Sequence, residues 1–229
     1  MKINKLHEFD LTFGEAAEIQ RRLAGKVVVS GGPRREDVEL VAGCDCAFDR
    51  KSGMAFGAIV LFKFPEMKRL RVIAGHRETR FPYVPGYLSF RELEVLLDLF
   101  ARLENPPDLV LVDGQGIAHP RRIGLASHLG LFLNVPTIGC AKSRLVGEAD
   151  EPGEKKGEWK PIMFEGEVVG SLLRTRDKVK PMFISPGHRM EVDSARDLAL
   201  ACVNKYRMPE PTRIADIEVA KYKRRVLDV

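Results

Sequence analysis

The chain has 229 residues, of which 45% are hydrophobic and 30% are charged, the composition of a soluble globular protein with a sizeable core. No run of about 18 apolar residues is present to span a membrane, and the N-terminal segment lacks the apolar stretch of a secretion signal. We therefore expect a cytoplasmic protein built as a single domain over residues 1–229. The net charge of +5 is weak evidence for an anionic partner, because 32 acidic residues balance 37 basic ones.

The first third of the chain predicts a helix followed by three antiparallel strands. Residues 14–25 have a helical composition and end on a glycine. Strand-like runs at 40–48, 54–64 and 70–78 are joined by short turn-like segments, which favours a meander. Within the first run Asp45 interrupts an apolar sequence. A charge in a central strand is costly unless it is paired or bound to a metal.

The four cysteines are expected to be buried thiols. Each lies among apolar neighbours and no CxxC pair occurs, which disfavours a zinc site or a disulfide. They are Cys44, Cys46, Cys140 and Cys202. The first two flank Asp45 in a predicted strand, so both should point to the face opposite the acid.

A stiff loop and a helix come next. The segment FPYVPGY at 81–87 combines two prolines, a glycine and three aromatic residues, which disfavours a helix. It is either a connector with its aromatic side chains in the core or a wedge presented to stacked nucleobases. A helix is predicted over 89–103, where Ser89 and Glu92 match the spacing of a capping box. From the pattern alone, that spacing favours a capping role for Glu92 over a catalytic one.

The apolar strand at 109–112 ends at Asp113, beside two glycines. Open α/β sheets bind ligands at the carboxyl ends of their strands, although an Asp-Gly pair after a strand is also common turn chemistry. A right-handed crossover through the helix at 89–103 would lay this strand parallel to the first one, with Asp45 and Asp113 facing each other. The start of that helix could bring Glu92 to the same place. Three converging carboxylates suit Mg²⁺, which prefers hard oxygen ligands.

The second half of the chain alternates predicted helices and strands. The expected helices span 122–133, 192–206 and a last segment from Thr212, its N-cap, to the basic run 221–225. The expected strands span 135–140, 161–164, 168–175 and 181–184, the middle two forming a hairpin about Glu165-Gly166. Residues 148–160 are charged and punctuated by Gly and Pro, and predict an exposed, mobile loop.

Histidines and basic runs complete the candidate site. His119 lies in a loop that Pro120 stiffens, among Gly, Ala, Pro and Arg neighbours that disfavour a core role, whereas His128 lies in an apolar helix and is expected to be buried. Basic residues gather in four runs, 121–122, 142–144, 174–180 and 221–225. Such runs are usually solvated faces, but several of them beside one acidic centre would suit a phosphodiester substrate.

Six blocks in order, GCDCAF, PYVPGYLSFRE, LVLVDGQGIAHPRRIGLASHLG, VPTIGCAKS, SPGH and EPTRIAD, resemble the endonuclease V family from about residue 40 to residue 221. The resemblance implies a ribonuclease H-like mixed sheet, with a three-stranded antiparallel meander plus parallel strands, flanked by helices. It also implies cleavage of nucleic acid at inosine, the product of adenine deamination. This cleavage would depend on Mg²⁺, which Mn²⁺ can replace. The resemblance further implies that the enzyme hydrolyses the second phosphodiester bond 3′ to the inosine and leaves a 3′-hydroxyl and a 5′-phosphate.

Site residues carry over from the family by position. The residues that match metal-binding acids are Asp45, Asp113 and Glu92, and those that match the other catalytic positions are His119, Lys142 and Asp216. The wedge that opens the duplex matches Tyr83. The remaining substrate-binding positions are Pro85, Gly86, Leu88, Gly114, Arg121, Leu145 and His188, of which the last could instead cap the next helix. The family usually has an aliphatic residue or serine where this chain has Cys44 and Cys46.

The resemblance leaves the substrate and partners partly open. The expected partner is inosine-containing DNA, or RNA if the chain is an inosine-specific endoribonuclease, because contacts to 2′-hydroxyl groups cannot be read from the sequence. A non-catalytic nucleic-acid-binding protein is disfavoured, since all three acids are present. A glycosylase would release free base and need no metal. We expect a monomer.

Overall fold

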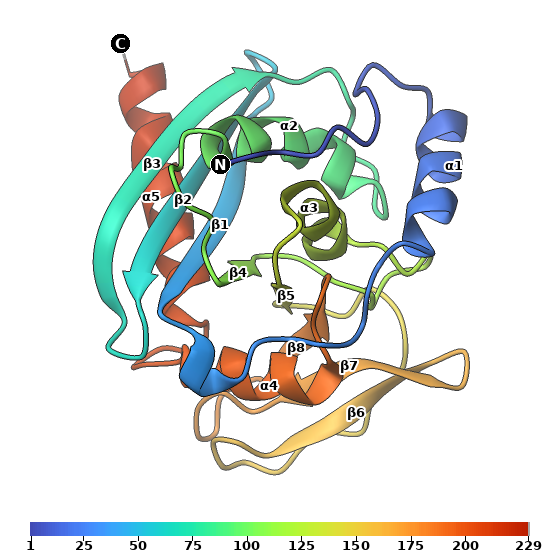
Figure 1. Cartoon of the computed structure of the whole chain (residues 1–229), viewed down its shortest axis with the longest axis vertical. Coiled ribbons are helices and arrows are strands. Elements are labelled where there is room, and N and C mark those ends of the chain that lie inside the picture. The colour runs from blue at the N-terminus through green and yellow to red at the C-terminus, as the bar shows by residue number, and fades with distance from the viewer. Residues whose placement is uncertain (229) are drawn as a thin grey trace.

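The structure is a computed structural model that describes residues 1–228. One eight-stranded sheet, in the order β3-β2-β1-β4-β5-β8-β7-β6, runs through the molecule between layers of helices (Figure 1). The strands are β1 (Leu40–Asp49), β2 (Met54–Lys63), β3 (Lys68–Glu78), β4 (Leu109–Val112), β5 (Thr137–Ala141), β6 (Trp159–Phe164), β7 (Glu167–Leu173) and β8 (Met182–Pro186). The helices are α1 (Phe13–Ala24), α2 (Leu88–Phe100), α3 (Leu125–Leu133), α4 (Val192–Ala201), α5 (Glu210–Leu227) and the short 3-10 helix η1 (Arg35–Asp37).

The predicted mixed topology is confirmed. Strands β1, β2 and β3 form an antiparallel meander, and β4 pairs with β1 in parallel after the crossover through α2. Strand β5 continues in parallel with β4, whereas β8 pairs with β5 and β7 in antiparallel fashion. The β6–β7 hairpin turns at Glu165 and Gly166, both of which have positive φ.

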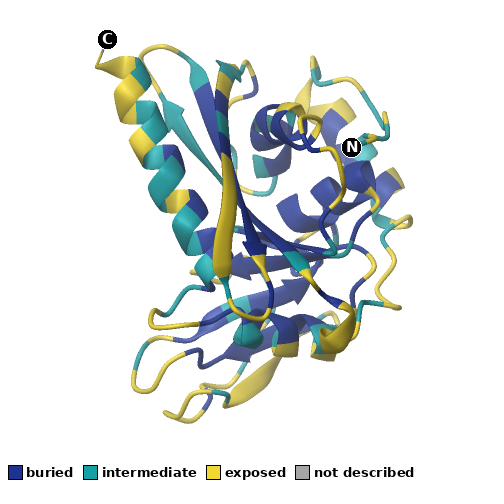
Figure 2. Ribbon diagram, turned by 60° about the vertical axis from the view of Figure 1, so that its left-hand side comes forward, coloured by how far each residue is buried: buried dark blue, intermediate teal, exposed yellow. Residues whose placement is uncertain are grey.

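The two faces of the sheet are covered by different helices. On one face Ala42 and Cys44 pack in a cluster with α2 and α3, as predicted for Cys44. On the other face Val41 packs in a cluster with α4, and α5 lies across β1 and β2. A Cβ on Gly43 would lie 2.1 Å from the backbone of Pro211, so only glycine lets the start of α5 approach β1 this closely. Figure 2 shows the buried interior of the sheet and the exposed outer side of α5.

The predicted helix N-caps are wrong at two places. Helix α2 begins at Leu88 after Tyr87 and has no side-chain cap, so Ser89 and Glu92 do not form a capping box. Instead the Ser89 hydroxyl lies 3.0 Å from Nδ1 of His128, which is fully buried as expected. Helix α5 begins at Glu210, and the buried Thr212 hydroxyl donates to the carbonyl of Pro209. In both helices a buried hydrogen bond, to His128 of α3 for Ser89 and to the Pro209 carbonyl for Thr212, takes the hydroxyl that the pattern assigned to a cap.

Two other predicted helices are longer than the observed ones. Helix α3 starts only at Leu125, because Gly124 packs directly on the carbonyl of Gln115, 2.4 Å from where a Cβ would be. Helix α4 ends at Ala201 instead of residue 206, and the carbonyl of Cys202 then accepts the backbone N–H of Glu210 at the start of α5. None of the helices within residues 1–228 is long and apolar enough to cross a bilayer.

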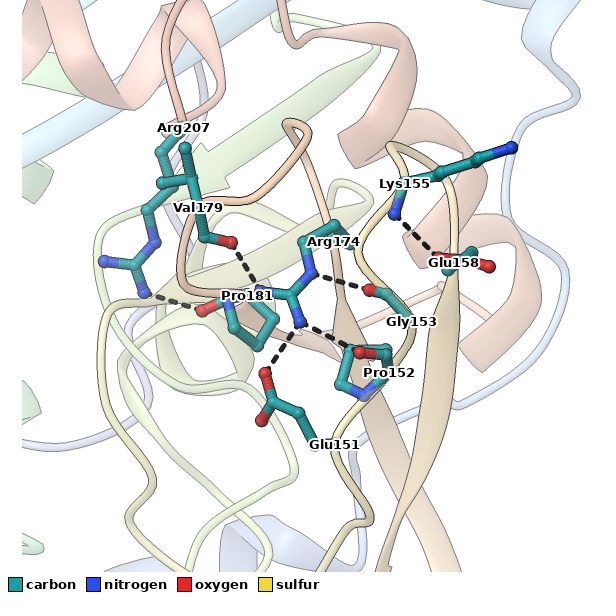
Figure 3. A network of polar contacts seen from close by, with 9 residues as sticks. All are labelled: Glu151, Pro152, Gly153, Lys155, Glu158, Arg174, Val179, Pro181 and Arg207. Carbon is teal, nitrogen blue, oxygen red and sulfur yellow. Dashed lines mark hydrogen bonds and ion pairs between the residues drawn. The ribbon is translucent and has the colours of Figure 1, made fainter.

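The charged loop at 148–160 is largely exposed, as predicted, but it is tied to the sheet (Figure 3). The buried guanidinium of Arg174 at the end of β7 donates to the carbonyls of Gly153, Pro152 and Val179 and pairs with Glu151 at 2.7 Å. Arg174 therefore fixes the loop and is not free to contact a phosphate, unlike the solvated basic run that the sequence suggested.

Candidate active site

Two acids lie level with one another on neighbouring parallel strands. Cys44 of β1 pairs with Val112 of β4, so the next residues, Asp45 and Asp113, stand side by side. The backbone N–H of Asp113 donates to the carbonyl of Cys44 at 3.3 Å, which continues the ladder by one step. By the alternation of strands both side chains face the α4 and α5 side of the sheet. The predicted juxtaposition of the two acids is confirmed.

Charged groups from β5 and α5 surround this pair. The Nζ atom of Lys142, just after β5, donates to Oδ2 of Asp113 at 2.7 Å. Asp216 is exposed on α5 and near enough to act on the charges of Asp45, Asp113 and Lys142. The middle of β1, the carboxyl ends of β4 and β5, and helix α5 thus contribute to a single charged centre.

Glu92 reaches this centre from the opposite face. It is 7% exposed in the first turns of α2, and its carboxylate makes no hydrogen bond or ion pair with any residue of the described chain 1–228. Burial, followed by the charges of Asp45 and Asp113, raises its pKa well above the ordinary value. A carboxylate buried without a partner is costly, so Glu92 is better explained by a ligand than by packing.

The pKa values of the two strand acids, Asp45 and Asp113, are raised as well. Burial, reinforced by the Asp113 carboxylate, raises the pKa of Asp45 to about 8. Burial also raises the pKa of Asp113, against the opposing effect of the hydrogen bond from Lys142. A cluster of buried acids whose charges repel one another is stabilised by a bound cation.

The acids present fit a magnesium ion that takes some of its ligands from the protein and the others from water and substrate. Within residues 1–228 no three Asp, Glu, His or Cys side chains lie close enough to enclose a metal ion by themselves. Mg²⁺ is commonly held by one or two carboxylates, with water and substrate phosphate completing its octahedron. The level pair Asp45 and Asp113 supplies that minimum, and the buried Glu92 lies near both acids.

A cavity of about 310 Å³ adjoins the acids. It opens between the 83–89 segment, the loop after β4 and the loop after β5, and Asp113, His119 and Lys142 form part of its wall. The other predicted substrate-binding residues in its lining are Tyr83, Pro85, Gly86, Leu88, Gly114 and Leu145. Tyr83 is 64% exposed, so the proposed wedge is not a core residue.

His119 is a fully hydrogen-bonded buried histidine. It is 3% exposed, so the expectation that it avoids the core is wrong. Its Nδ1 accepts the backbone N–H of Arg121 at 3.1 Å, and its Nε2 lies 3.0 Å from the carbonyl of Gly86. These contacts assign the neutral tautomer with the proton on Nε2. Burial, helped by the Arg121 charge, lowers the pKa of His119 to about 4, so the ring is neutral at physiological pH.

Two other predicted contact residues, His188 and Arg121, and Arg122 beside them in sequence make hydrogen bonds to the protein itself. His188 is buried, lies outside the cavity, and its Nδ1 accepts the backbone N–H of Val28 at 3.2 Å. Arg121 binds the backbone of the 81–87 loop at Gly86. Its neighbour Arg122 donates to the carbonyl of Phe164 at 3.1 Å in the β6–β7 hairpin. The paired arginines therefore organise loops in this structure, although the sequence suggested a phosphodiester contact.

Two residues that hold the loops of the site in place were not predicted from the sequence. Arg207, after α4, donates to the backbone carbonyls of Lys142 at 3.2 Å and Pro181 at 2.6 Å, which holds the segment that carries the lysine. Gln20, in α1, bonds to the cavity loop. Neither residue lies in a recognisable motif, and only the tertiary structure brings them to the site.

Comparison with known proteins decides the family. The sequence matches the family model for Endonuclease V over residues 21–217. An endonuclease V from Dehalococcoides mccartyi is 47% identical over 221 residues, which are 96% of this chain and 98% of the relative. The chain belongs to the endonuclease V family.

Solved structures of endonuclease V agree with this assignment. The enzyme from Bacillus subtilis superposes with a TM-score of 0.94 at 31% identity, covering 100% of this chain and 99% of that one. The Ciona intestinalis endonuclease V, solved in complex with a 24mer DNA containing an inosine followed by a ribo-adenosine, gives a TM-score of 0.83 at 31% identity over 93% of this chain and 98% of its own. The fold is therefore the ribonuclease H-like fold of endonuclease V, and the chain is a nuclease by family.

Proposed function

We propose that this endonuclease V is a Mg²⁺-dependent repair enzyme that acts as a monomer on inosine-containing nucleic acid. It hydrolyses the second phosphodiester bond 3′ to the inosine and leaves a 3′-hydroxyl and a 5′-phosphate. The observation that carries the proposal is the level pair Asp45 and Asp113 beside a cavity lined by Tyr83. The position of the cut rests on the family resemblance alone.

Asp45 and Asp113 would hold the ion, Mg²⁺ or Mn²⁺, and the buried Glu92 would join them as a third ligand only once the ion is bound. When bound, the ion would stabilise the charge that develops on the phosphate and on the leaving 3′ oxygen. Lys142, which is 46% exposed while paired to Asp113, places a positive charge where a phosphate would approach. Asp216 adds a carboxylate on the α5 side. The neutral His119 holds the loop that lines the cavity and is not poised to donate a proton.

The cavity is suited to a flipped base. Its volume lies near the lower end of the roughly 300–1,000 Å³ usual for ligand pockets, and enzymes that act at one nucleotide commonly turn it out of the stack. Hypoxanthine offers an acceptor at O6 and a donor at N1, the reverse of adenine, and lacks the 2-amino group of guanine. Backbone near Gly86, Leu88 and Gly114 can approach the edge of such a base closely. The Ciona intestinalis relative bound to inosine-containing DNA supports this substrate class.

The test is cleavage of an end-labelled strand with one inosine, in Mg²⁺ and in excess EDTA. We expect one cut, in Mg²⁺ only, at the second bond 3′ to the inosine, and none with Asp113→Asn. Release of free hypoxanthine from an intact strand in EDTA would indicate a glycosylase. Binding without cutting in Mg²⁺ would indicate a non-catalytic protein.

The alternative is an inosine-specific endoribonuclease with the same active site. The cavity residues give no reason to prefer a deoxyribose, since a 2′-hydroxyl is recognised by contacts outside the base. Matched DNA and RNA strands with one inosine, cut side by side, separate the two. A clear preference for the RNA strand would replace the DNA assignment.

A further inference from the structure

A buried glutamine outside every motif binds the backbone of the cavity loop. Gln20 lies in α1 and is 1% exposed. Its Nε2 donates to the carbonyl of Gly86 at 2.9 Å, and its Oε1 accepts from Nε of Arg121 at 2.5 Å. Both ends of the amide are therefore engaged with residues of the cavity region, 66 and 101 positions away along the chain.

The carbonyl of Gly86 receives two further donors. Nη2 of Arg121 lies 2.9 Å away and Nε2 of His119 lies 3.0 Å away. A carbonyl oxygen has two lone pairs, so three donors saturate it. The carbonyl is consequently unavailable as an acceptor for substrate, and its three bonds fix the peptide plane of a residue that lines the cavity.

The backbone at Gly86 depends on this anchoring. Its φ of +81° lies in the region that favours glycine, and a Cβ there would come within 3.2 Å of Nη2 of Arg121. Beyond it, the Arg121 guanidinium lies 4.3 Å over the Tyr87 ring, against which Phe13 of α1 packs edge-on at 5.7 Å. One end of the loop is thus clamped to α1, whereas Tyr83 at the other end is exposed.

We propose that Gln20 is a positioning residue for inosine recognition. By fixing Arg121 and the Gly86 carbonyl, it sets the direction of the main-chain groups that face the base. This inference rests on the proposed function, since it needs inosine to enter this cavity. Misplacing a recognition group by about 1 Å lowers the efficiency of an enzyme by roughly 100-fold. We therefore expect loss of Gln20 to weaken selection of inosine by roughly 10- to 100-fold.

The experiment compares the full-length wild type with Gln20→Leu, which removes both bonds at similar volume, and Gln20→Glu, which keeps an acceptor for Arg121 but cannot donate to Gly86. Leu23→Ala is the matched control, because Leu23 is 1% exposed in the same helix and packs on Ile123 and Leu131, away from the loop. Each protein is titrated, with Ca²⁺ in place of Mg²⁺, against a strand with one inosine and the same strand with adenosine. Thermal melting is recorded for all four proteins.

Both Gln20 variants should lose roughly 10- to 100-fold affinity for the inosine strand and keep the wild-type affinity for the adenosine strand. Leu23→Ala should melt lower but keep full discrimination. Unchanged discrimination in both Gln20 variants would overturn the inference, and so would an equal loss in Leu23→Ala. If Gln20→Leu does not fold, Gln20→Glu decides alone. A wild type that does not distinguish the two strands would overturn the proposed function itself.

Discussion

Replacing Asp45 by asparagine should stabilise the metal-free protein and remove its response to Mg²⁺. The pKa of Asp45 is raised from an ordinary value of 3.8 to about 8 by burial and by Asp113. At pH 7 the Asp45 carboxyl is therefore ionised in the unfolded chain and mostly protonated in the folded chain, and the free energy of ionisation favours the unfolded state. That difference spans about three pH units at roughly 1.4 kcal/mol each, so it destabilises the fold by about 4 kcal/mol as an upper limit.

The pH dependence of this effect follows from its sign. Because the folded state binds the proton more tightly, wild-type stability falls as the pH rises from about 4 to about 8. Asparagine does not titrate, so the gain from Asp45→Asn should be absent near pH 4 and complete near pH 8. For a chain of this length each kcal/mol corresponds to about 2–4 °C in Tm.

The assay is thermal melting in EDTA and in Mg²⁺, at several pH values. Mg²⁺ should raise the Tm of the wild type by binding only the folded state, and should leave Asp45→Asn unchanged. Asp49→Asn is the matched control in the same strand, because hydrogen bonds from Ser52 lower the pKa of Asp49, so its replacement should give no stabilisation. The reasoning is refuted if Asp45→Asn melts no higher than wild type in EDTA at pH 8, or if Mg²⁺ raises both proteins equally.

Three further predictions concern substrate binding. Tyr83→Ala should change the free energy of unfolding by no more than about 0.5 kcal/mol, because Tyr83 is 64% exposed. It should weaken binding of the inosine strand by about 1–3 kcal/mol through lost stacking. A large drop in Tm would instead mean a core role. Gly114→Val should fold, since a Cβ would lie 3.4 Å from Leu125. It should fill the cavity and abolish cleavage at inosine, while non-specific binding of the strand persists. Retained cleavage would mean that the base binds elsewhere. Neutralising the exposed Arg224 and Arg225 should make the plot of log binding constant against log salt concentration shallower, by roughly one unit of slope per lost phosphate contact. The change should be equal for strands with and without inosine. A loss of affinity confined to inosine strands would exclude a backbone contact.

The sheet and its acids were predictable because they follow from local patterns and from one topological rule. Alternating and continuous apolar runs identified the strands, and the handedness of the crossover placed β4 beside β1. The position of Asp45 and Asp113 at one level then required only their places within their strands. The family motifs added Tyr83 and the other cavity residues, which no periodicity indicates.

The contacts that hold the site could not be predicted in the same way. Ser89 and Glu92 have the spacing of a capping box, yet the tertiary structure buries both, one beside His128 and the other beside the acids. Gln20 and Arg207 act on backbone carbonyls, which carry no sequence signature. A basic run likewise cannot reveal whether its arginines face solvent or, as Arg174 does, bind a neighbouring loop.

The central claim is that Asp45 and Asp113, side by side on β1 and just after β4, form a metal centre. The most direct measurement is an anomalous difference map from crystals of this protein soaked in Mn²⁺, which binds the same oxygen ligands as Mg²⁺ and scatters anomalously. We predict a peak in contact with the carboxylates of Asp45 and Asp113, and no such peak in crystals of Asp45→Asn. Wild-type crystals with no peak at these two acids, or with the same peak retained in Asp45→Asn, would contradict the account.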